Sequence, residues 1–251
     1  MWTPAALSSE IRQHRQDCLR FVEDQHRIST LRLVDSLEEQ LQLEELLDTA
    51  KPPIPQECRH LHYLLFTPFR YRPAAHGSRF RAVGDRSGVL YGAESVETAL
   101  HEIAFYRLLF LAEAPGMIAP ERPTSMTVFC FANGPAAIID LTTEPLLGDA
   151  HLWQNLADYA ACQALATTAR AAGVEAIRYG SMRHAGGFNW AILTCRKLSD
   201  PYPERYRQWH LLADRKGVTA SSEHPERQTR RLDAQIFRQD ERLKGLDLNG
   251  P

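Results

Sequence analysis

Short apolar runs alternate with helical patterns between Leu61 and about Leu198, and this alternation is what most restricts the folds open to the chain. Runs rich in β-branched and aromatic residues predict strands, and we expect them at 63–66, 88–93, 127–132, 136–140, 175–179 and 191–195. Because these strands are short and Gly134-Pro135 separates two of them, the pattern favours a mixed β-sheet core with flanking helices, of the α+β class, over a doubly wound parallel sheet.

Two helices are expected within this region. The first begins after Ser95, a good N-cap, and continues through an apolar stretch to about Leu111. The second is rich in alanine, extends from about His151 to Ala172, and ends at Gly173, a natural helix terminator. We expect the first helix to be buried on more than one face.

With the segments on either side of this region, the sequence predicts three parts of the chain. Residues 1–55 form an N-terminal helical extension, because leucines recur at helical spacing until Lys51-Pro52-Pro53 ends the pattern. This extension is either a strut packed on the main domain or an arm for homo-oligomerisation or partner binding. Residues 56–200 form the main domain. Residues 201–251 form a polar C-terminal segment that packs partly on it through Trp209 and Leu211.

The charge balance argues against direct contact with nucleic acid. The formal net charge is -2 and the pI is about 6.6, whereas phosphate contacts need a clustered basic surface. The chain also has no secretory signal pattern and no apolar stretch long enough to cross a bilayer. We therefore expect a soluble, cytoplasmic protein that does not associate with a membrane.

The cysteines predict neither a disulfide framework nor a metal site. The five cysteines are scattered, odd in number and form no CxxC pair, so we expect reduced thiols. Cys58, His60 and His62 lie close together in sequence, but their spacing matches no common zinc site and nothing downstream completes four ligands. We expect no bound metal.

A group of three side chains suits chemistry on a nucleotide. Arg79 offers a rigid fork of donors that matches phosphate oxygens, and Tyr91 offers an aromatic face with a polar tip. Glu102 lies among apolar neighbours of a helix, where a carboxylate can stabilise a developing positive charge. Cleavage of an N-glycosidic bond in a dinucleotide needs a phosphate-binding group, an aromatic surface and a carboxylate, since the ribosyl centre passes through an oxocarbenium-like state.

A second group of polar residues lies at 177–190. A predicted strand leads into Ser181, a glycine turn follows, and Asn189 begins the next strand. Small polar residues beside glycines are common where a ligand approaches the backbone. The alternative is a tight hairpin in which Ser181 and Asn189 only satisfy the amides of the turn.

Taken in order, these motifs resemble those of the RES domain family, named for a recurring arginine, glutamate and serine. The resemblance covers roughly residues 66–195 and rests on Arg79-Phe80, Val89-Leu90-Tyr91-Gly92-Ala93, Glu97-Thr98-Ala99-Leu100-His101-Glu102 and Arg178-Tyr179-Gly180-Ser181. It implies a fold similar to that of ADP-ribosyltransferases and a bacterial toxin of a toxin-antitoxin pair that consumes NAD+ as its substrate. Such toxins hydrolyse NAD+, phosphorolyse it or transfer ADP-ribose to a protein, and a small Xre-like antitoxin inhibits them.

The resemblance also implies roles for individual residues. Arg79 corresponds to the arginine that holds the phosphates, Tyr91 to the aromatic partner of the nicotinamide, Glu102 to the acidic residue and Ser181 to the serine. Family members often have Arg-Trp-Asn where this chain has Arg79-Phe80-Arg81, so Arg81 is a second candidate for the phosphates. Ser181 and Asn189 would bind the ribose or the carboxamide.

Two other classes of function remain open from the sequence. In a non-catalytic interaction module, the same residues would form a structural polar network, and Arg79 and Glu102 would not have to line one cleft. An RNA-cleaving toxin is supported only by His101 and His184, and the lack of a basic face argues against it.

Overall fold

A computed structural model describes residues 2–24, 33–72, 76–114, 116–198, 204–223 and 226–246. Its helices are α1 (Pro4–Ser9), α2 (Leu37–Ala50), α3 (Tyr63–Arg70), α4 (Val96–Glu113), α5 (Ala150–Trp153) and α6 (Ala160–Ala171). Its strands are β1 (Arg12–Glu23), β2 (Leu90–Ala93), β3 (Thr124–Asp140), β4 (Ala176–Gly180), β5 (Phe188–Ile192), β6 (Glu204–Asp214), β7 (Gly217–Ser222) and β8 (Gln228–Asp233).

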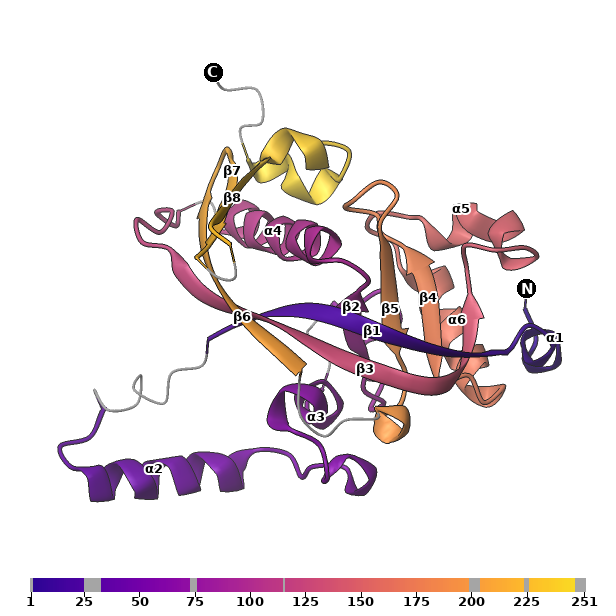
Figure 1. Cartoon of the computed structure of the whole chain (residues 1–251), viewed down its shortest axis with the longest axis horizontal. Coiled ribbons are helices and arrows are strands. Elements are labelled where there is room, and N and C mark those ends of the chain that lie inside the picture. Colours follow the sequence, from indigo (N-terminus) through magenta and orange to yellow (C-terminus); the bar gives the residue numbers. More distant parts are fainter. Residues whose placement is uncertain are drawn as a thin grey trace.

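The strands form one mixed sheet in the order β1-β2-β5-β4-β3-β6-β7-β8, and β1 also pairs with β3 (Figure 1). Because β1 pairs with both β2 and β3, the pairings β1-β2-β5-β4-β3-β1 close on themselves. Among the strand pairs of the described residues, β3 and β4 run parallel and the others are antiparallel. The expected mixed sheet with flanking helices, of the α+β class, is confirmed.

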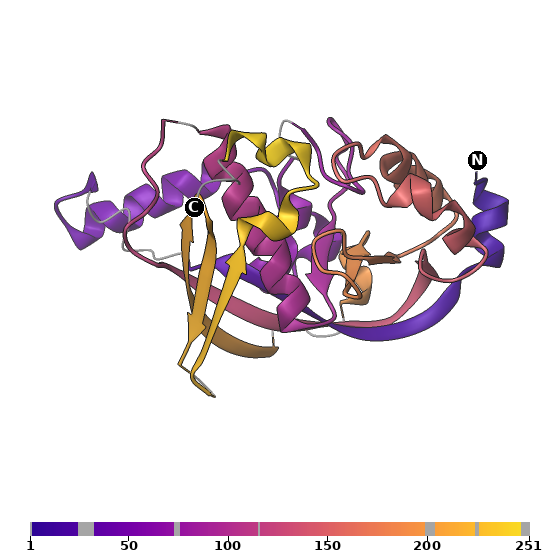
Figure 2. The ribbon, with the colours of Figure 1, turned by 90° about the horizontal axis from the view of Figure 1, so that it is seen from above.

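Helix α4 is the central helix of the structure and lies beside β7, β8 and the C-terminal turns (Figures 1 and 2). As expected, the Ser95 side chain caps it by accepting a hydrogen bond from the amide of Thr98 at 3.1 Å. Leu100, Phe105 and Leu108 of α4 are fully buried. They belong to an apolar cluster that includes Trp209 and Val218, so the helix is held between the sheet and the C-terminal segment.

The prediction of helix for the N-terminal part of the chain is wrong for residues 12–23, which form β1. This strand pairs with β3 from Arg12, opposite Ile138, to Glu23, opposite Met126. Its residues are mostly polar, so partnership with a distant strand, and not a local apolar pattern, stabilises it. Residues 12–23 are therefore part of the sheet. The helical prediction for residues 25–32 lies outside the described residues.

The helical prediction is confirmed at 37–50, where α2 begins after its cap Ser36. Helix α2 leaves Leu37, Leu41 and Leu46 largely exposed, and Figure 1 shows it away from α4 and the C-terminal turns. Its role as an arm for oligomerisation or partner binding stays a prediction.

Residues 63–66 were expected to form a strand, and this prediction is wrong because they begin α3. A short apolar run does not distinguish a strand from a buried helix. Here Leu65 and Phe69, one helical turn apart, are buried in a cluster with Leu90 and Trp190.

Three further boundaries differ from expectation. The expected strands on either side of Gly134-Pro135 are one continuous strand, β3, and the strand expected at 191–195 begins earlier, as β5. The helix expected at 151–172 is interrupted, and its halves are α5 and α6. The interruption has a local cause, because the Asn155 side chain accepts hydrogen bonds from the amides of Ala157 and Asp158 at 3.0 and 2.8 Å.

The C-terminal segment packs on the rest of the chain more extensively than its polar composition suggests. Strands β6, β7 and β8 extend the sheet beyond β3, and Trp209 and Leu211 are buried, as expected. Phe237 and Leu243, from the turns that follow β8, pack on the same cluster as α4. Among the described parts of the chain, no helix is long and apolar enough to cross a membrane.

The expectation that every cysteine is a reduced thiol is corrected at one pair. Cys58 and Cys195 form a disulfide that connects the turn before α3 to the segment after β5. Because 137 residues separate the two cysteines in sequence, the sequence pattern does not predict that they are close in the fold. Cys18, Cys130 and Cys162 are buried and take no part in this disulfide.

Candidate active site

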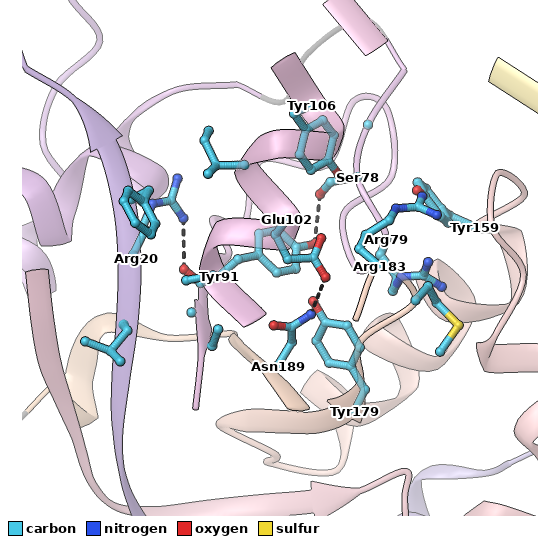
Figure 3. Close-up of a pocket in the computed structure, with 18 residues that line it drawn as sticks. Arg20, Ser78, Arg79, Tyr91, Glu102, Tyr106, Tyr159, Tyr179, Arg183 and Asn189 are labelled. Carbon is cyan, nitrogen blue, oxygen red and sulfur yellow. Dashed lines mark hydrogen bonds between the residues drawn. The ribbon is translucent and has the colours of Figure 1, made fainter. Parts of the chain in front are cut away.

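A cavity of about 340 Å³ lies where β1, β2 and α4 meet the loops that follow β4 and precede α6 (Figure 3). Its polar and aromatic lining comprises Arg20, Phe21, Ser78, Arg79, Tyr91, Glu102, Tyr106, Tyr159, Tyr179, Arg183 and Asn189. Four of the predicted site residues line this one cavity although they come from separate segments: Arg79, Tyr91, Glu102 and Asn189.

A tight turn carries Arg79 into the cavity wall. Gly77 has φ of 66°, a left-handed conformation that favours glycine, and a Cβ there would lie 2.5 Å from the carbonyl oxygen of Arg81. Nη1 of Arg79 donates to the carbonyls of Trp153 and Asn155 at 2.7 and 3.0 Å. Trp153 ends α5 and Asn155 lies in the interruption before α6, so the break in the helix fixes the arginine.

Tyr91 is held by its hydroxyl, which leaves the ring as its contribution to the cavity. The hydroxyl oxygen accepts from the amide of Phe80 at 2.9 Å and shares a hydrogen bond with Ser78 Oγ at 2.9 Å. Removal from water raises the pKa of Tyr91 to about 12. The phenol therefore stays neutral and fixes the turn that carries Arg79.

Glu102 lies on α4, and two neutral donors orient it, of which Figure 3 shows Asn189. Its Oε1 accepts from Ser181 Oγ at 2.8 Å and from Asn189 Nδ2 at 2.5 Å. Oε2 receives no hydrogen bond from another described residue. One carboxylate oxygen is thus used for orientation and the other is left for a ligand.

Ser181 and Asn189 are therefore placed beside Glu102, but in different ways. Asn189 lines the cavity from β5, whereas Ser181 does not line it. Ser181 Oγ also accepts from the amides of Arg183 and His184, each at 3.1 Å. Ser181 therefore does satisfy amides of the turn, as the alternative interpretation expected, but it also donates to Glu102. We interpret Ser181 as a positioning residue that connects this turn to the carboxylate.

Arg81 does not lie where we expected it. Its guanidinium points toward the end of α3, where Nη2 donates to the carbonyl of Tyr71 at 2.7 Å and Nη1 to that of Pro68 at 3.4 Å. It is buried and does not line the cavity. The expectation that Arg81 shares the phosphate role is corrected, because its guanidinium is held at the end of α3, outside the cavity lining.

Two arginines give the cavity a positive charge. Neither Arg20 nor Arg79 forms an ion pair with a carboxylate of the described residues; Arg20 Nη1 donates to the carbonyl of Tyr91 at 3.0 Å, and Arg79 donates to carbonyls as described above. Burial lowers the pKa of Arg20 from its ordinary value. A cation held away from water without a partner is unfavourable, so an anionic ligand would be stabilised here.

Sequence reasoning missed Arg20 and the tyrosines at 106, 159 and 179. The sequence predicts a helix around Arg20, and only its place on β1 brings it beside Tyr91. Tyr179 was part of the Arg178-Tyr179-Gly180-Ser181 motif, yet no role was given to it. Its burial raises its pKa well above the ordinary value, so its phenol is a neutral hydrogen-bonding group in the cavity wall.

Arg183 also lines the cavity, and the C-terminal segment holds it. Its Nη2 lies 2.9 Å from Oδ2 of Asp240, which also accepts from Arg242 Nη2 at 2.8 Å. Both arginines donate to the carbonyl of Leu156, at 3.0 and 2.7 Å. This Asp240 cluster, defined as Arg183, Asp240 and Arg242, connects the turn after β4, the loop before α6 and the C-terminal segment.

The two histidines that could support RNA cleavage lie outside the cavity lining. Their rings stack with centroids 4.4 Å apart, His184 Nδ1 bonds to Thr98 Oγ1 at 2.9 Å, and His101 Nδ1 bonds to the carbonyl of Glu97 at 2.8 Å. These contacts describe a structural pair at the start of α4. Within the described ranges, no group of histidine, cysteine and acidic residues is arranged to hold a metal ion.

Comparison with known proteins adds the following findings. No curated protein matches the chain. One similar solved structure is the crystal structure of the M. tuberculosis MbcT-MbcA toxin-antitoxin complex, with 12% sequence identity and a TM-score of 0.46 over 91% of this chain and 90% of that one. The model of the RES domain matches residues 54–214, which is more than half of the chain. The chain therefore belongs to the RES domain family.

Proposed function

We propose that this chain is a toxin that consumes NAD+ by cleaving the bond between nicotinamide and ribose, by hydrolysis or phosphorolysis. The observation that carries the proposal is that Arg79, Tyr91 and Glu102, from three segments, line one cavity. An interaction module has no need for this convergence. Membership of the RES family supports it, because RES toxins are generally enzymes that use NAD+.

The charges of the cavity suit the substrate. Arg79 would bind the pyrophosphate, since a guanidinium fits two phosphate oxygens, and it has no carboxylate partner among the described residues. Tyr91 and Tyr179 offer aromatic surface and neutral phenols to the nicotinamide ribose. In Figure 3, Glu102 lies between Arg20 on one side and Arg79 and Arg183 on the other, so a pyrophosphate at Arg79 would leave the ribose beside the carboxylate.

Glu102 would then stabilise the cation formed as the bond breaks. The electron pair of the glycosidic bond leaves with the nicotinamide nitrogen, which becomes neutral, and the ribosyl carbon becomes electron-poor. A carboxylate oriented before the reaction stabilises this charge without reorganisation. Water or phosphate then adds to the anomeric carbon, and the proton lost by water passes to solvent or to the carboxylate.

The test is incubation of the purified chain with NAD+ while nicotinamide release is followed. We expect release, and its absence would contradict the proposal. Chromatography of the products with and without phosphate separates hydrolysis, which yields ADP-ribose, from phosphorolysis, which yields a phosphorylated product. A labelled band after incubation of a lysate with labelled NAD+ would instead identify transfer of ADP-ribose to a protein.

The family also supports the proposal of an antitoxin partner of the Xre-like type. Such a protein would cover the cavity and stop access of NAD+. Addition of a stoichiometric amount of the cognate protein is expected to abolish nicotinamide release. Unchanged release in a stable complex would contradict inhibition at the cavity.

Ser181→Ala is expected to lower kcat for nicotinamide release by about tenfold or more, with a smaller change in KM. The substitution removes one of the two donors to Glu102 Oε1, and a hydrogen bond to a charged group contributes about 1.5–3 kcal/mol. Steady-state kinetics on NAD+ measure the effect. Ser87→Ala, on an exposed loop away from the cavity, is the control. Equal rates for the two variants would show that Ser181 does not position the carboxylate.

A further inference from the structure

The loop between α5 and α6 is held from two sides. In the cavity wall, Nη1 of Arg79 donates to the carbonyl of Asn155 at 3.0 Å. Outside the cavity lining, Nη2 of Arg242 donates to the carbonyl of Leu156 at 2.7 Å. Arg242 belongs to the C-terminal turns and lies beyond residues 54–214, the part of the chain that matches the RES domain. The loop therefore connects an arginine of the cavity to a segment that the family match does not include.

Tyr159 is the last residue of this loop, and it contacts both arginines. The guanidinium carbon of Arg79 lies 4.6 Å from the centre of the Tyr159 ring, within the range of a cation–π contact, and Figure 3 shows the two side chains together. The hydroxyl of Tyr159 accepts from Nη2 of Arg242 at 3.1 Å and donates to the carbonyl of Leu156 at 3.1 Å. The ring thus lies against one arginine while the other arginine fixes its hydroxyl.

The contacts of Arg79 leave part of its guanidinium for a ligand. All of its hydrogen bonds to described residues use Nη1, so Nε and Nη2 are left for phosphate oxygens. Because the guanidinium lies over the ring of Tyr159, a shift of this ring would move both of these donors. A pair of parallel bonds from a guanidinium to phosphate needs a defined geometry. The affinity for a pyrophosphate should therefore depend on the position of Tyr159.

Arg242 is itself held by the buried side chain of Asp240. Its Nε donates to Oδ1 of Asp240 at 2.9 Å and its Nη2 to Oδ2 at 2.8 Å. One planar guanidinium thus reaches Asp240, Leu156 and Tyr159 at the same time. A lysine in this place would keep a positive charge beside Asp240, but a single ammonium group does not reproduce the planar fork that makes all three contacts.

We propose that Arg242 is a positioning residue that sets the affinity for NAD+ by holding Tyr159 in contact with Arg79. This inference rests on the proposed function, because it assigns the pyrophosphate of NAD+ to Arg79. Loss of a contact with only a structural role would lower the stability of the fold. Loss of a positioning contact raises KM for NAD+ and leaves kcat almost unchanged, because Glu102 and its two donors stay in place.

The test uses the variants Arg242→Lys and Tyr159→Phe of the full chain. The first keeps a charge beside Asp240 and the second keeps the ring beside Arg79, but each removes one side of the hydrogen bond between the guanidinium and the hydroxyl. We expect KM for NAD+ to rise about fivefold in each variant, the usual effect of one lost hydrogen bond, with kcat within about twofold of the parent value. Arg238→Lys is the matched control, because Arg238 is exposed in the same segment and does not line the cavity. It should keep the parent KM.

The double variant Arg242→Lys/Tyr159→Phe tests whether the two residues act through one contact. If they do, its KM equals that of either single variant, because each single substitution has already removed the shared contact. A KM that multiplies the two single effects would show that the residues act independently and would overturn the proposal. So would an unchanged KM together with a lower melting temperature, since Arg242 would then only stabilise the fold.

If the parent chain releases no nicotinamide from NAD+, the proposed function fails instead. Calorimetric titration with inorganic pyrophosphate then decides the positioning role. This role requires weaker binding by Arg242→Lys and Tyr159→Phe than by the parent chain and Arg238→Lys. Equal binding by all four chains, or no binding by the parent chain, would overturn it.

Discussion

Glu102→Gln is expected to slow nicotinamide release from NAD+ by about a hundredfold or more, without a loss of folding. Glutamine keeps the length of the side chain and an oxygen that can accept from Ser181 and Asn189, as Oε1 does now. What it removes is the negative charge that faces the developing ribosyl cation. Loss of a preorganised electrostatic contact of this kind costs on the order of a hundredfold in turnover.

Steady-state kinetics on NAD+ measure this effect, and circular dichroism with thermal unfolding checks the fold. Glu113→Gln is the matched control, because Glu113 is an exposed residue at the end of the same helix and does not line the cavity. It should retain the rate of the parent chain. Normal turnover by a folded Glu102→Gln variant would mean that this carboxylate does not act on the reacting carbon.

The parts of the fold that the sequence predicts correctly are those with local signals. Helix α4 has its cap at Ser95 and a long apolar stretch, and α6 is followed by Gly173, whose φ is 80°. β1 has no such signal, because residues 12–23 form a strand through pairing with β3, more than a hundred residues away in sequence. Non-local pairing of this kind leaves no periodic pattern in the strand itself.

The same distinction holds for the site. The sequence identifies Arg79, Tyr91 and Glu102 because each lies in a short motif and has a side chain suited to a role in nucleotide chemistry. Arg20 could not, since its place in the cavity depends on the β1 strand. The choice between Arg79 and Arg81 also needed the structure, because only the path of the backbone after Gly77 determines which guanidinium lines the cavity and which one the α3 carbonyls hold.

The C-terminal segment contributes to the cavity wall in a way that the sequence does not predict. Asp240 lies beyond residues 54–214, which match the RES domain, yet it pairs with Arg183 in the cavity wall. Its side chain is 1% exposed, and Oδ1 also accepts from the amide and Nε of Arg242 at 3.1 and 2.9 Å. Burial by itself raises the pKa of Asp240, but the bonds from Arg242 and the charge of Arg183 outweigh it, so its pKa lies below the ordinary value.

Asp240→Asn is accordingly expected to lower the free energy of unfolding by about 3 kcal/mol, since removal of one partner of a buried ion pair leaves uncompensated charge. For a chain of this size the melting temperature should fall by roughly 6–12 °C. Thermal unfolding measures the change, and Glu241→Gln is the control, because Glu241 is 79% exposed in its pair with Lys244 and should matter little. Equal melting temperatures for the two variants would show that the Asp240 cluster does not stabilise the fold.

The pH dependence provides an independent check of the same ion pairs. A carboxyl group whose pKa is lower in the folded chain contributes stability above its unfolded pKa, near 3.8, and this contribution is lost as the pH falls through the folded pKa. The difference in stability between the parent chain and Asp240→Asn should therefore be greatest near neutral pH and shrink below about pH 4. A difference that stays constant into acid would assign the loss to packing or hydrogen bonding. A difference that shrinks would assign it to charge, and would mean that a residue outside the family match holds Arg183 in the cavity wall.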